Sequence, residues 1–256
     1  MPVVFLFLIA AALTATISGI FGMAGGMIFM AVITLYLGVA EAMIVHGAVQ
    51  SGSNLSRAYF LRQDIRWDVI RNHFFGAVPI IIVLAFVSFI PDKQLLFTAL
   101  GLLPFLLWLP RGWLQGDAEK PVHAMFCGAL IIALNILAGV AGPALDFFYV
   151  KTAMTRQQIV ATKAVTMLFS HIVKIVYYLS AVIFFVETGK DSSLTNLPPW
   201  WFYFAAIPCI IFGTYLGTRV LLTLKDINFK NYTKYLVTLI GVYYLLRAAG
   251  FFGGVG

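Results

Sequence analysis

Apolar stretches long enough to cross a lipid bilayer recur along the whole chain. A transmembrane α-helix needs about 20 predominantly apolar residues, and about 17 can suffice. The chain is 61% hydrophobic and only 11% charged, and none of its hydrophilic segments is long enough to fold alone. The stretches, two of which consist of two parts, are Val3–Ser18 with Met27–Leu37, Ala42–Leu61, Val69–Ile90, Gln94–Leu109, His123–Leu137 with Ala144–Val150, Ile159–Val186, Trp200–Leu224 and Tyr235–Ala249. The sequence therefore predicts one all-α, polytopic membrane domain over residues 1–256.

The first residues and the two cysteines carry little further information. The opening MPVVFLFLIA lacks the positively charged region of a cleaved signal peptide, so we expect it to form part of the structure. Cys127 and Cys209 both lie inside apolar stretches, where they indicate neither a redox compartment nor a metal site. We therefore expect no metal and no cofactor.

Four glycines occur within the eight residues GIFGMAGG, Gly19–Gly26. They interrupt an apolar run, residues 2–38, that holds no charged side chain. Glycine is a poor helix former. The run is therefore either broken at this point, or its glycines let another helix pack closely, as Gly-x-x-x-Gly motifs do in membranes.

A shift of the sequence by 117 positions brings this motif onto a second one, LAGVAGP. The shift pairs Gly22 with Gly139, Gly25 with Gly142, Gly26 with Pro143, His46 with Lys163, Ser53 with Ser170, Asn54 with His171 and Arg57 with Lys174. Farther along, PDKQLLFTALGLL resembles KNYTKYLVTLIGVY at an offset of 140, through Gly101 and Gly241. A constant offset across about forty residues indicates an internal duplication. We expect repeat one to cover residues 1–110 and repeat two residues 121–250.

The recurrence of the glycine motif helps to choose between its two interpretations. Gly22 and Gly26 have the spacing of a helix-packing motif, and so do Gly213 and Gly217, for which we expect packing. A matching motif in the second half that contains Pro143 favours a break in the helix instead, because proline suits the first turn of the helix that follows.

The lysines and arginines predict how the two halves are oriented, since cytoplasmic loops are enriched in these residues. If all eight apolar units crossed the membrane, the two sides would carry eight and seven of the 17 cations. If the two glycine-interrupted units make no net crossing, the sides carry twelve and three, with Lys163 and Lys174 inside the membrane. This second arrangement inverts one half relative to the other. It places both termini outside the cytoplasm, and Arg62–Arg71 and Lys225–Lys234 within it.

The limb that follows the second glycine motif is short. Ala144–Lys151 has eight residues, which make about 12 Å of helix at 1.5 Å per residue, against a hydrocarbon core of about 30 Å. Ten full crossings would give the same charge count, so that alternative stays open, but the short limb favours re-entry. We therefore predict two inverted-topology repeats, each with a glycine-broken re-entrant first unit followed by three transmembrane helices.

Two helices carry polar side chains along one face. His46, Gln50, Ser53 and Arg57 are spaced by 4, 3 and 4 residues, and Lys163, Thr166, Ser170 and Lys174 by 3, 4 and 4, with His171 beside them. These spacings place each set on a single helical face. Re-entrant limbs would add two helix N-termini near the midplane, whose free N–H groups favour an anion. Ionisable residues within a span usually line a pathway or pair with one another.

These features predict a site for an anion at the midplane. The expected substrate-binding residues are Gly22, Gly25, Gly26, Ser53, Asn54, Arg57, Gly139, Gly142, Lys163, Ser170, His171 and Lys174, and the candidates for proton coupling are His46 and Asp146. Backbone N–H groups after Gly25 and Gly142 should face the ligand, because only a residue without a side chain lets the backbone approach it closely. Lys163 should supply the central charge, with Arg57 at a cytoplasmic mouth and Lys174 at an outer mouth.

Each assignment has a simpler alternative. Arg57 and Lys174 would snorkel toward an interface, His46 and His171 would be satisfied packing residues, and the matching serines would hydrogen-bond only their own helix backbones. Asp146 has no acidic counterpart in the first half, where Phe29 stands. It would either neutralise Lys163 or carry a coupling proton.

The motifs resemble those of the sulfite exporter TauE/SafE family of permeases. The residues that carry the resemblance are GIFGMAGG with the apolar limb that follows, the polar helix that ends in SNLSRAYFLRQDIRWD, and LAGVAGP at the half-way point. The similarity extends over essentially the whole chain. It implies duplicated halves and transport of small sulfur-containing oxyanions such as sulfite, thiosulfate or sulfonates, and of other organic anions. The second motif has only Gly139 and Gly142 before Pro143, so the two breaks need not contribute equally.

Together these observations predict a secondary transporter of a small anion, most simply a sulfur oxyanion or an organosulfonate such as sulfoacetate, that works by alternating access at the repeat interface. The alternatives are an anion channel and a transporter of small carboxylates. The sequence contains no GxSxG, HExxH, GxGD or DDxxD motif, so we expect no enzyme. The expected partners are the anion and the lipid bilayer of the cell (inner) membrane, without nucleic acid. The direction of transport, the coupling ion and the oligomeric state are not predicted.

Overall fold

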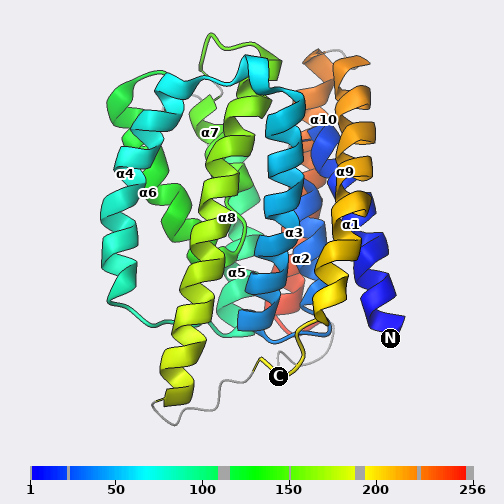
Figure 1. Cartoon of the computed structure of the whole chain (residues 1–256). Coiled ribbons are helices and arrows are strands. Elements are labelled where there is room, and N and C mark those ends of the chain that lie inside the picture. The colour runs from blue at the N-terminus through cyan, green and yellow to red at the C-terminus, as the bar shows by residue number, and fades with distance from the viewer. Residues whose placement is uncertain are drawn as a thin grey trace.

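The computed structural model describes residues 2–21, 24–108, 116–149, 151–187, 194–223 and 226–251, and within them the fold is all-helical (Figure 1). The helices are α1 (Pro2–Phe21), α2 (Ala24–Ile33), α3 (Val39–Phe60), α4 (Trp67–Ala85), α5 (Lys93–Leu102), α6 (Pro121–Ala138), α7 (Gly142–Tyr149), α8 (Arg156–Glu187), α9 (Trp200–Thr223) and α10 (Asp226–Ala248), with 3-10 turns η1 (Arg62–Asp64) and η2 (Leu103–Trp108). The all-α prediction is confirmed.

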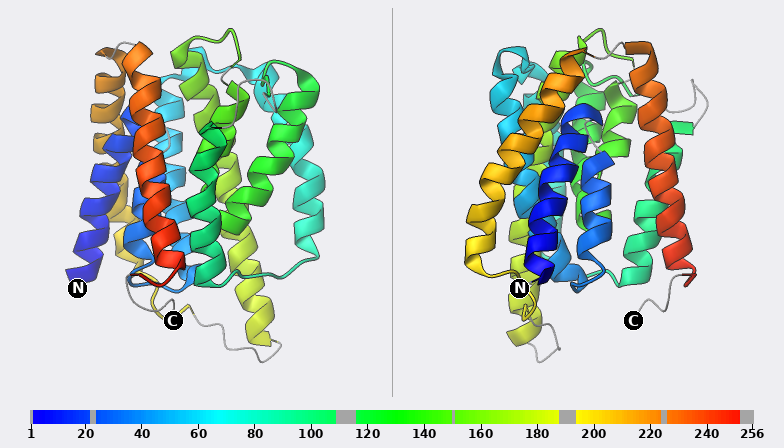
Figure 2. Two further views of the ribbon diagram at one scale, coloured as in Figure 1. Left: turned by 180° about the vertical axis from the view of Figure 1, so that it is seen from behind. Right: turned by 90° about the vertical axis from the view of Figure 1, so that its right-hand side faces the viewer.

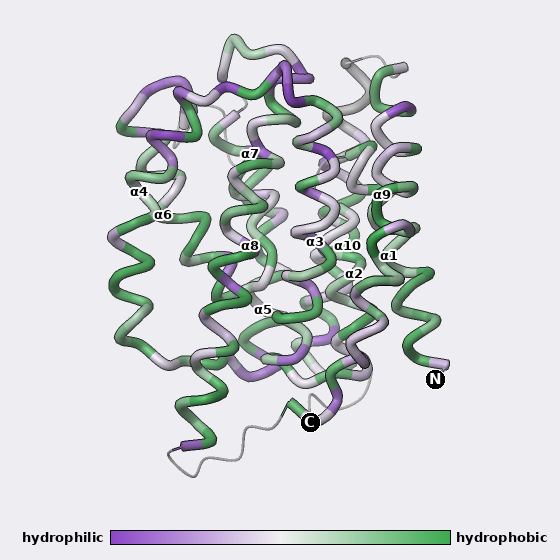
Figure 3. Tube along the Cα trace, viewed as in Figure 1, coloured by the Kyte–Doolittle hydropathy of each residue, from purple (hydrophilic) through white to green (hydrophobic). Residues whose placement is uncertain are grey.

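Five of these helices, α1, α4, α6, α8 and α9, are long and apolar enough to cross a membrane. Their outer faces expose large apolar side chains, such as Ile9, Phe126 and Phe204, each at least 60% exposed. Figure 3 shows apolar residues along the flanks of the bundle and hydrophilic residues at both ends and inside it, most densely at the upper end. Broad exposed apolar faces of this kind fit contact with lipid. α3 is not among the five, because a stripe of polar residues runs along its buried face.

The helix boundaries differ from several of the predicted stretches, and α10 begins at Asp226 rather than at Tyr235. The predicted stretch Val69–Ile90 is helical only as far as Ala85, where α4 ends. The predicted stretch Gln94–Leu109 begins as α5 and tightens into η2 from Leu103 onward. Pro104 follows at once, and its missing N–H removes the hydrogen bond that an α-helix would need there.

The two glycine motifs separate a long helix from a short one. α1 has 20 residues and α2 has 10, whereas α6 has 18 and α7 has eight. α6 ends at Gly139, which has a left-handed φ of 70° and whose N–H donates to the carbonyl of Asn135. A left-handed residue after a helix is commonly glycine, because any side chain would be strained there.

The path of the chain follows from Figures 1 and 2. α1 rises from the lower end and α2 returns toward it, while α6 descends from the upper end and α7 returns upward. α3, α5 and α9 run upward, and α4, α8 and α10 run downward. The first residues of α1 and the last residues of α10 therefore both lie at the lower end.

Close helix pairs depend on glycines. The most extensive pairings are α1 with α9, α3 with α8, α4 with α6, and α5 with α10. A Cβ atom on Gly213 or Gly217 would overlap the backbone of α1, and one on Gly76 or Gly128 would overlap the backbone of the partner helix in the α4–α6 pair. The predicted packing role of Gly213 and Gly217 is confirmed.

Candidate functional site

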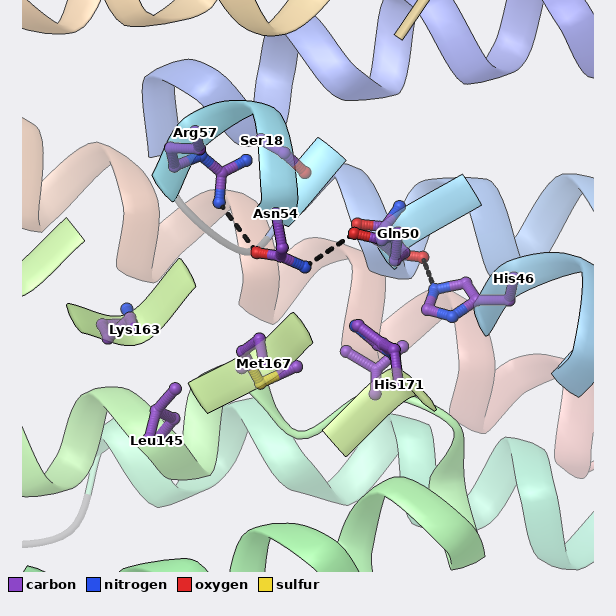
Figure 4. A pocket seen from close by; sticks show the side chains of 12 residues that line it. Ser18, His46, Gln50, Asn54, Arg57, Leu145, Lys163, Met167 and His171 are labelled. Carbon is purple, nitrogen blue, oxygen red and sulfur yellow. Dashed lines mark hydrogen bonds between the residues drawn. The ribbon is translucent and has the colours of Figure 1, made fainter. Parts of the chain in front are cut away.

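A small cavity lies between the two glycine-interrupted units and the two polar helices (Figure 4). Its lining residues are Ser18, Gly26, His46, Gln50, Asn54, Arg57, Val140, Gly142, Leu145, Lys163, Met167 and His171. They come from α1, α2, α3, α7 and α8 and from the turn between α6 and α7. The cavity volume is about 30 Å³. One water molecule needs about 10–15 Å³, so the cavity has room for a ligand of only a few atoms.

One wall of the cavity is the polar face of α3. His46, Gln50, Asn54 and Arg57 follow one another at spacings of 4, 4 and 3 residues, which aligns them along the cavity as Figure 4 shows. All four are buried. The polar stripe that lowers the hydropathy of α3 therefore faces the interior of the bundle and not the lipid.

Arg57 is a buried cation without a carboxylate partner among the described residues. Its residue exposure is 3%. One Nη atom donates to Asn54 Oδ1 at 3.3 Å and the other to Ser53 Oγ at 3.5 Å. Its Nε has no hydrogen-bond partner. A buried guanidinium with an unused donor is costly, so it is suited to receive an anion from the cavity.

Lys163 faces the cavity from α8 and is held from behind by a carboxylate. Its Nζ forms an ion pair with Asp146 of α7. Asp146 lies one turn after Gly142, the first residue of α7. The short limb after the second break thus supplies the counter-ion of a cavity lysine.

Lys174 is fully buried in a cluster that we call the Lys174 cluster, consisting of Lys174, His46 and the Gly139 carbonyl. Lys174 Nζ donates to the Gly139 carbonyl at 2.7 Å and lies 2.8 Å from His46 Nδ1. His46 Nε2 lies 3.0 Å from the carbonyl of Gly26. The Lys174 ammonium can only donate and the Gly26 carbonyl can only accept, so His46 accepts at Nδ1 and donates from Nε2. The cluster joins α3 and α8 to both glycine motifs.

Further polar contacts hold the two stripes in place. Asn135 Nδ2 donates to Ser170 Oγ at 2.7 Å and lies 3.4 Å from His171 Nδ1. Ser53 Oγ lies 3.2 Å from the hydroxyl of Thr214 on α9. The two serines therefore bond side chains of other helices, and the expectation that they bond only their own helix backbones is wrong.

The structure brings seven of the predicted residues to the cavity, which are Gly26, His46, Asn54, Arg57, Gly142, Lys163 and His171. The residues outside its lining are Gly25, Ser53, Gly139, Asp146, Ser170 and Lys174. Gly22 lies outside the described residues. His46 and His171, whose ring centroids are 5.4 Å apart, sit at the end of the cavity nearest the Lys174 cluster.

Three expectations need correction. Neither Arg57 nor Lys174 snorkels, because both side chains are buried within the bundle. Lys174 does not lie at an outer mouth but in the interior cluster. Gly25 faces α1, where a Cβ would overlap the Thr14 carbonyl and the Ser18 hydroxyl, so its missing side chain serves helix packing. Its neighbour Gly26 is the one that faces the cavity.

Five lining residues were not predicted as ligands. Gln50 belongs to the polar stripe of α3, and Met167 occupies the matching position in α8, 117 residues later. The sequence pattern could therefore have placed both residues at the site. Ser18, Val140 and Leu145 are ordinary residues of an apolar stretch, and only the folded arrangement of the broken units brings them to the cavity. Among the described residues, no group of three or more His, Cys, Asp or Glu side chains could hold a metal ion.

Comparison with known proteins identifies the family. The model of the sulfite exporter TauE/SafE family matches residues 7–244. No curated protein and no solved structure gives a significant match. The family match covers nearly the entire chain, including both glycine motifs, both polar helices and the cavity between them. Members of this family are multi-pass membrane transporters of anionic substrates, not enzymes, and the chain belongs to the sulfite exporter TauE/SafE family.

Proposed function

We propose that this protein is a secondary transporter of a small sulfur-containing anion, which binds in the cavity between α3 and α8. The observation that carries the proposal is the uncompensated charge at the cavity. Arg57 has an unused Nε donor and no carboxylate partner among the described residues. The other cation of the lining, Lys163, is paired with the carboxylate of Asp146. An anion would supply the charge that the protein lacks.

The size and the donors of the cavity support a compact oxyanion. A cavity of about 30 Å³, which holds about two or three water molecules, favours the smallest oxyanions such as sulfite, and sulfoacetate would require larger movements of side chains. Gln50 and His171 border the same space and offer further polar groups. Gly142 adds the N-terminal end of α7, where free N–H groups favour negative charge.

Alternating access requires two halves that can exchange roles, and the contacts support inverted repeats. Exchanging each helix for its counterpart in the other half converts the α1–α9 pair into the α6–α4 pair. The α3–α8 and α5–α10 pairs convert into themselves. The matching glycines Gly101 and Gly241 face each other, since a Cβ on either would approach the other's carbonyl oxygen within about 3 Å. Matching residues meet in this way when they lie near the axis that relates two repeats.

The side chains of the site also form matching pairs in the two halves. The Phe29 and His46 rings lie 6.2 Å apart, and their counterparts at an offset of 117, Asp146 and Lys163, form the ion pair. α1 and α6 also run in opposite directions, as do α3 and α8 (Figure 1). These relations support inverted halves, and the lengths of α2 and α7, 10 and eight residues, favour re-entrant first units over ten full crossings.

We further propose that both termini lie outside the cytoplasm. The turn between α3 and α4, the segment before α6 and the turn between α7 and α8 with the first residue of α8 lie at the upper end in Figure 1, and they contain Arg62, Arg66, Lys120, Lys151 and Arg156. The start of α5 and the end of α10 lie at the lower end, and they contain Lys93 and Arg247. In a background without native cysteines, Lys120→Cys and Gln94→Cys should label with a membrane-impermeant thiol reagent from opposite sides. Labelling of both from the same side would contradict the inverted arrangement.

The direction that needs no coupled ion is export. A negative cell interior expels an anion by about 2.3 kcal/mol per charge per 100 mV. In this direction His46 and Asp146 need carry no proton; import would require a coupled ion and would make these two residues the candidates. Efflux from proteoliposomes driven by the membrane potential alone, without a pH gradient, is the expected result.

The decisive experiment measures binding and flux of the purified protein. Thermal shifts with sulfite should exceed those with taurine, sulfoacetate and simple carboxylates. Arg57→Gln should weaken binding by about ten- to a hundredfold, as expected for loss of a charge-assisted hydrogen bond. The matched control is Arg62→Gln, an exposed arginine five residues after Arg57, which should leave binding unchanged. Equal effects of both variants, or unitary currents in planar bilayers, would overturn the proposal.

A further inference from the structure

We propose that Asp146 determines the charge of the anion that the site accepts, because it neutralises Lys163 and leaves Arg57 as the only unpaired cation among the described residues that line the cavity. The site then prefers a monoanion to a dianion. This inference rests on the proposed function, since it names which class of small anion binds at the same cavity.

The argument begins with the positions of the two groups. Lys163 lines the cavity and Asp146 does not. The side chains of the pair are 10% and 23% exposed. A ligand in the cavity can therefore contact Lys163 but not Asp146. The negative charge of the ligand has to compete with that of Asp146 for Lys163.

Arg57 offers the opposite situation at the other side of the cavity. Its hydrogen bonds go to neutral oxygens of Asn54 and Ser53, and Nε is free. A monoanion at Arg57 would be neutralised by this one charge. A second negative charge on the ligand would find Lys163 already compensated, and an unpaired charge in a buried site is costly.

Lys174 lies outside the cavity lining, so its charge acts on a ligand only from behind His46. Its ammonium is held by His46 Nδ1 and the Gly139 carbonyl, and it does not line the cavity. Any contact between the ligand and Lys174 would require the Lys174 cluster to open.

The first half of the chain gives an internal comparison. The positions that match Asp146 and Lys163 hold Phe29 and His46, which pack ring against ring. In the first half this pair of positions is neutral because neither member is charged, with His46 in the neutral form that its partners require. In the second half it is neutral because the two charges cancel. Removal of the Asp146 carboxylate alone would therefore leave a net positive charge at a pair of positions that is neutral in both halves.

The test uses two ligands of nearly the same shape and different charge, methanesulfonate and sulfate. Affinities are measured by calorimetry on the detergent-purified full chain. Wild-type protein should bind methanesulfonate more tightly than sulfate. Asp146→Asn should shift the ratio toward sulfate by about tenfold or more, because it frees a charged hydrogen-bond donor. Asp146→Glu should retain the wild-type preference.

The outcomes separate this inference from the proposed function. If wild-type protein prefers sulfate, or if Asp146→Asn changes both affinities by the same factor, the inference is wrong although anion binding stands. If neither anion binds wild-type protein and Arg57→Gln has no effect on any anion, the proposed function fails. The wild-type preference is measurable even where Asp146→Asn does not fold.

Discussion

The polar faces of α3 and α8 match at a constant offset, yet their charged residues have different environments. Arg57 on α3 and Lys174 on α8 occupy matching positions, 117 residues apart. Arg57 lines the cavity with an unused donor, whereas Lys174 is enclosed by His46 and a backbone carbonyl. The comparison teaches that a repeated scaffold does not repeat its chemistry. Arg57 is left available to a ligand, whereas Lys174 links α8 to α3 and to the C-terminal end of α6.

The same contrast separates the two glycine motifs. The first contains Gly25, packed against the backbone of α1, and Gly26, open to the cavity. The second contains Gly139, which ends α6 in a left-handed conformation, and Gly142, which begins α7 at the cavity. Each motif therefore uses one glycine for backbone geometry and another for the site.

The largest effect is expected at Gly25. Gly25→Val would place side-chain atoms on the Thr14 carbonyl and the Ser18 hydroxyl, and backbone atoms cannot move aside as a flexible side chain can. We expect no monodisperse protein in size-exclusion chromatography. Gly26→Ala is the matched control, because its Cβ would lie 3.5 Å from the nearest atoms of Gln50 and His46, an ordinary contact. A stable Gly25→Val protein would show that the α1–α2 contact is not as close as described.

This pair of glycines also shows where sequence reasoning ends. Composition and apolar stretches predict the helices, and the spacing of polar residues predicts which face of α3 borders the cavity. Adjacent residues of a helix, however, point about 100° apart, so the sequence does not say which of Gly25 and Gly26 meets the ligand. The answer depends on how α2 is rotated against α1, which only the packing determines.

The same limit applies to Lys174. Its position in the stripe predicts that it faces the interior side of α8, and this much is confirmed by its burial. Its partner is the carbonyl that the left-handed turn at Gly139 exposes. No spacing rule connects two residues 35 positions apart, so a binding role and a structural role look alike in the sequence.

A second prediction tests the contrast between the two cations. Lys174→Met should lower the free energy of unfolding by about 1–3 kcal/mol, because it leaves the buried Gly139 carbonyl without its donor. Arg57→Gln should change stability much less and anion affinity much more. Chemical denaturation in mixed micelles measures the first quantity and calorimetry the second. If Lys174→Met is as stable as wild type but loses binding, the two cations share one role and the contrast disappears.

The smallest effect distinguishes the two matching serines. Ser170 accepts a hydrogen bond from Asn135 Nδ2 at 2.7 Å, whereas Ser53 lies 3.2 Å from Thr214 Oγ1 and 3.5 Å from an Nη atom of Arg57. Ser170→Ala leaves the shorter bond unmade and should cost about 1 kcal/mol of stability, within the range of about 0.5–1.5 kcal/mol for a neutral hydrogen bond. Ser53→Ala should cost less stability but should alter anion binding slightly, since Ser53 helps to orient Arg57. Thermal unfolding with and without a saturating anion checks both expectations. An anion-induced stabilisation that is unchanged in Ser53→Ala and reduced in Ser170→Ala would reverse the roles of the two stripes, and it would place the ligand on α8 rather than on α3.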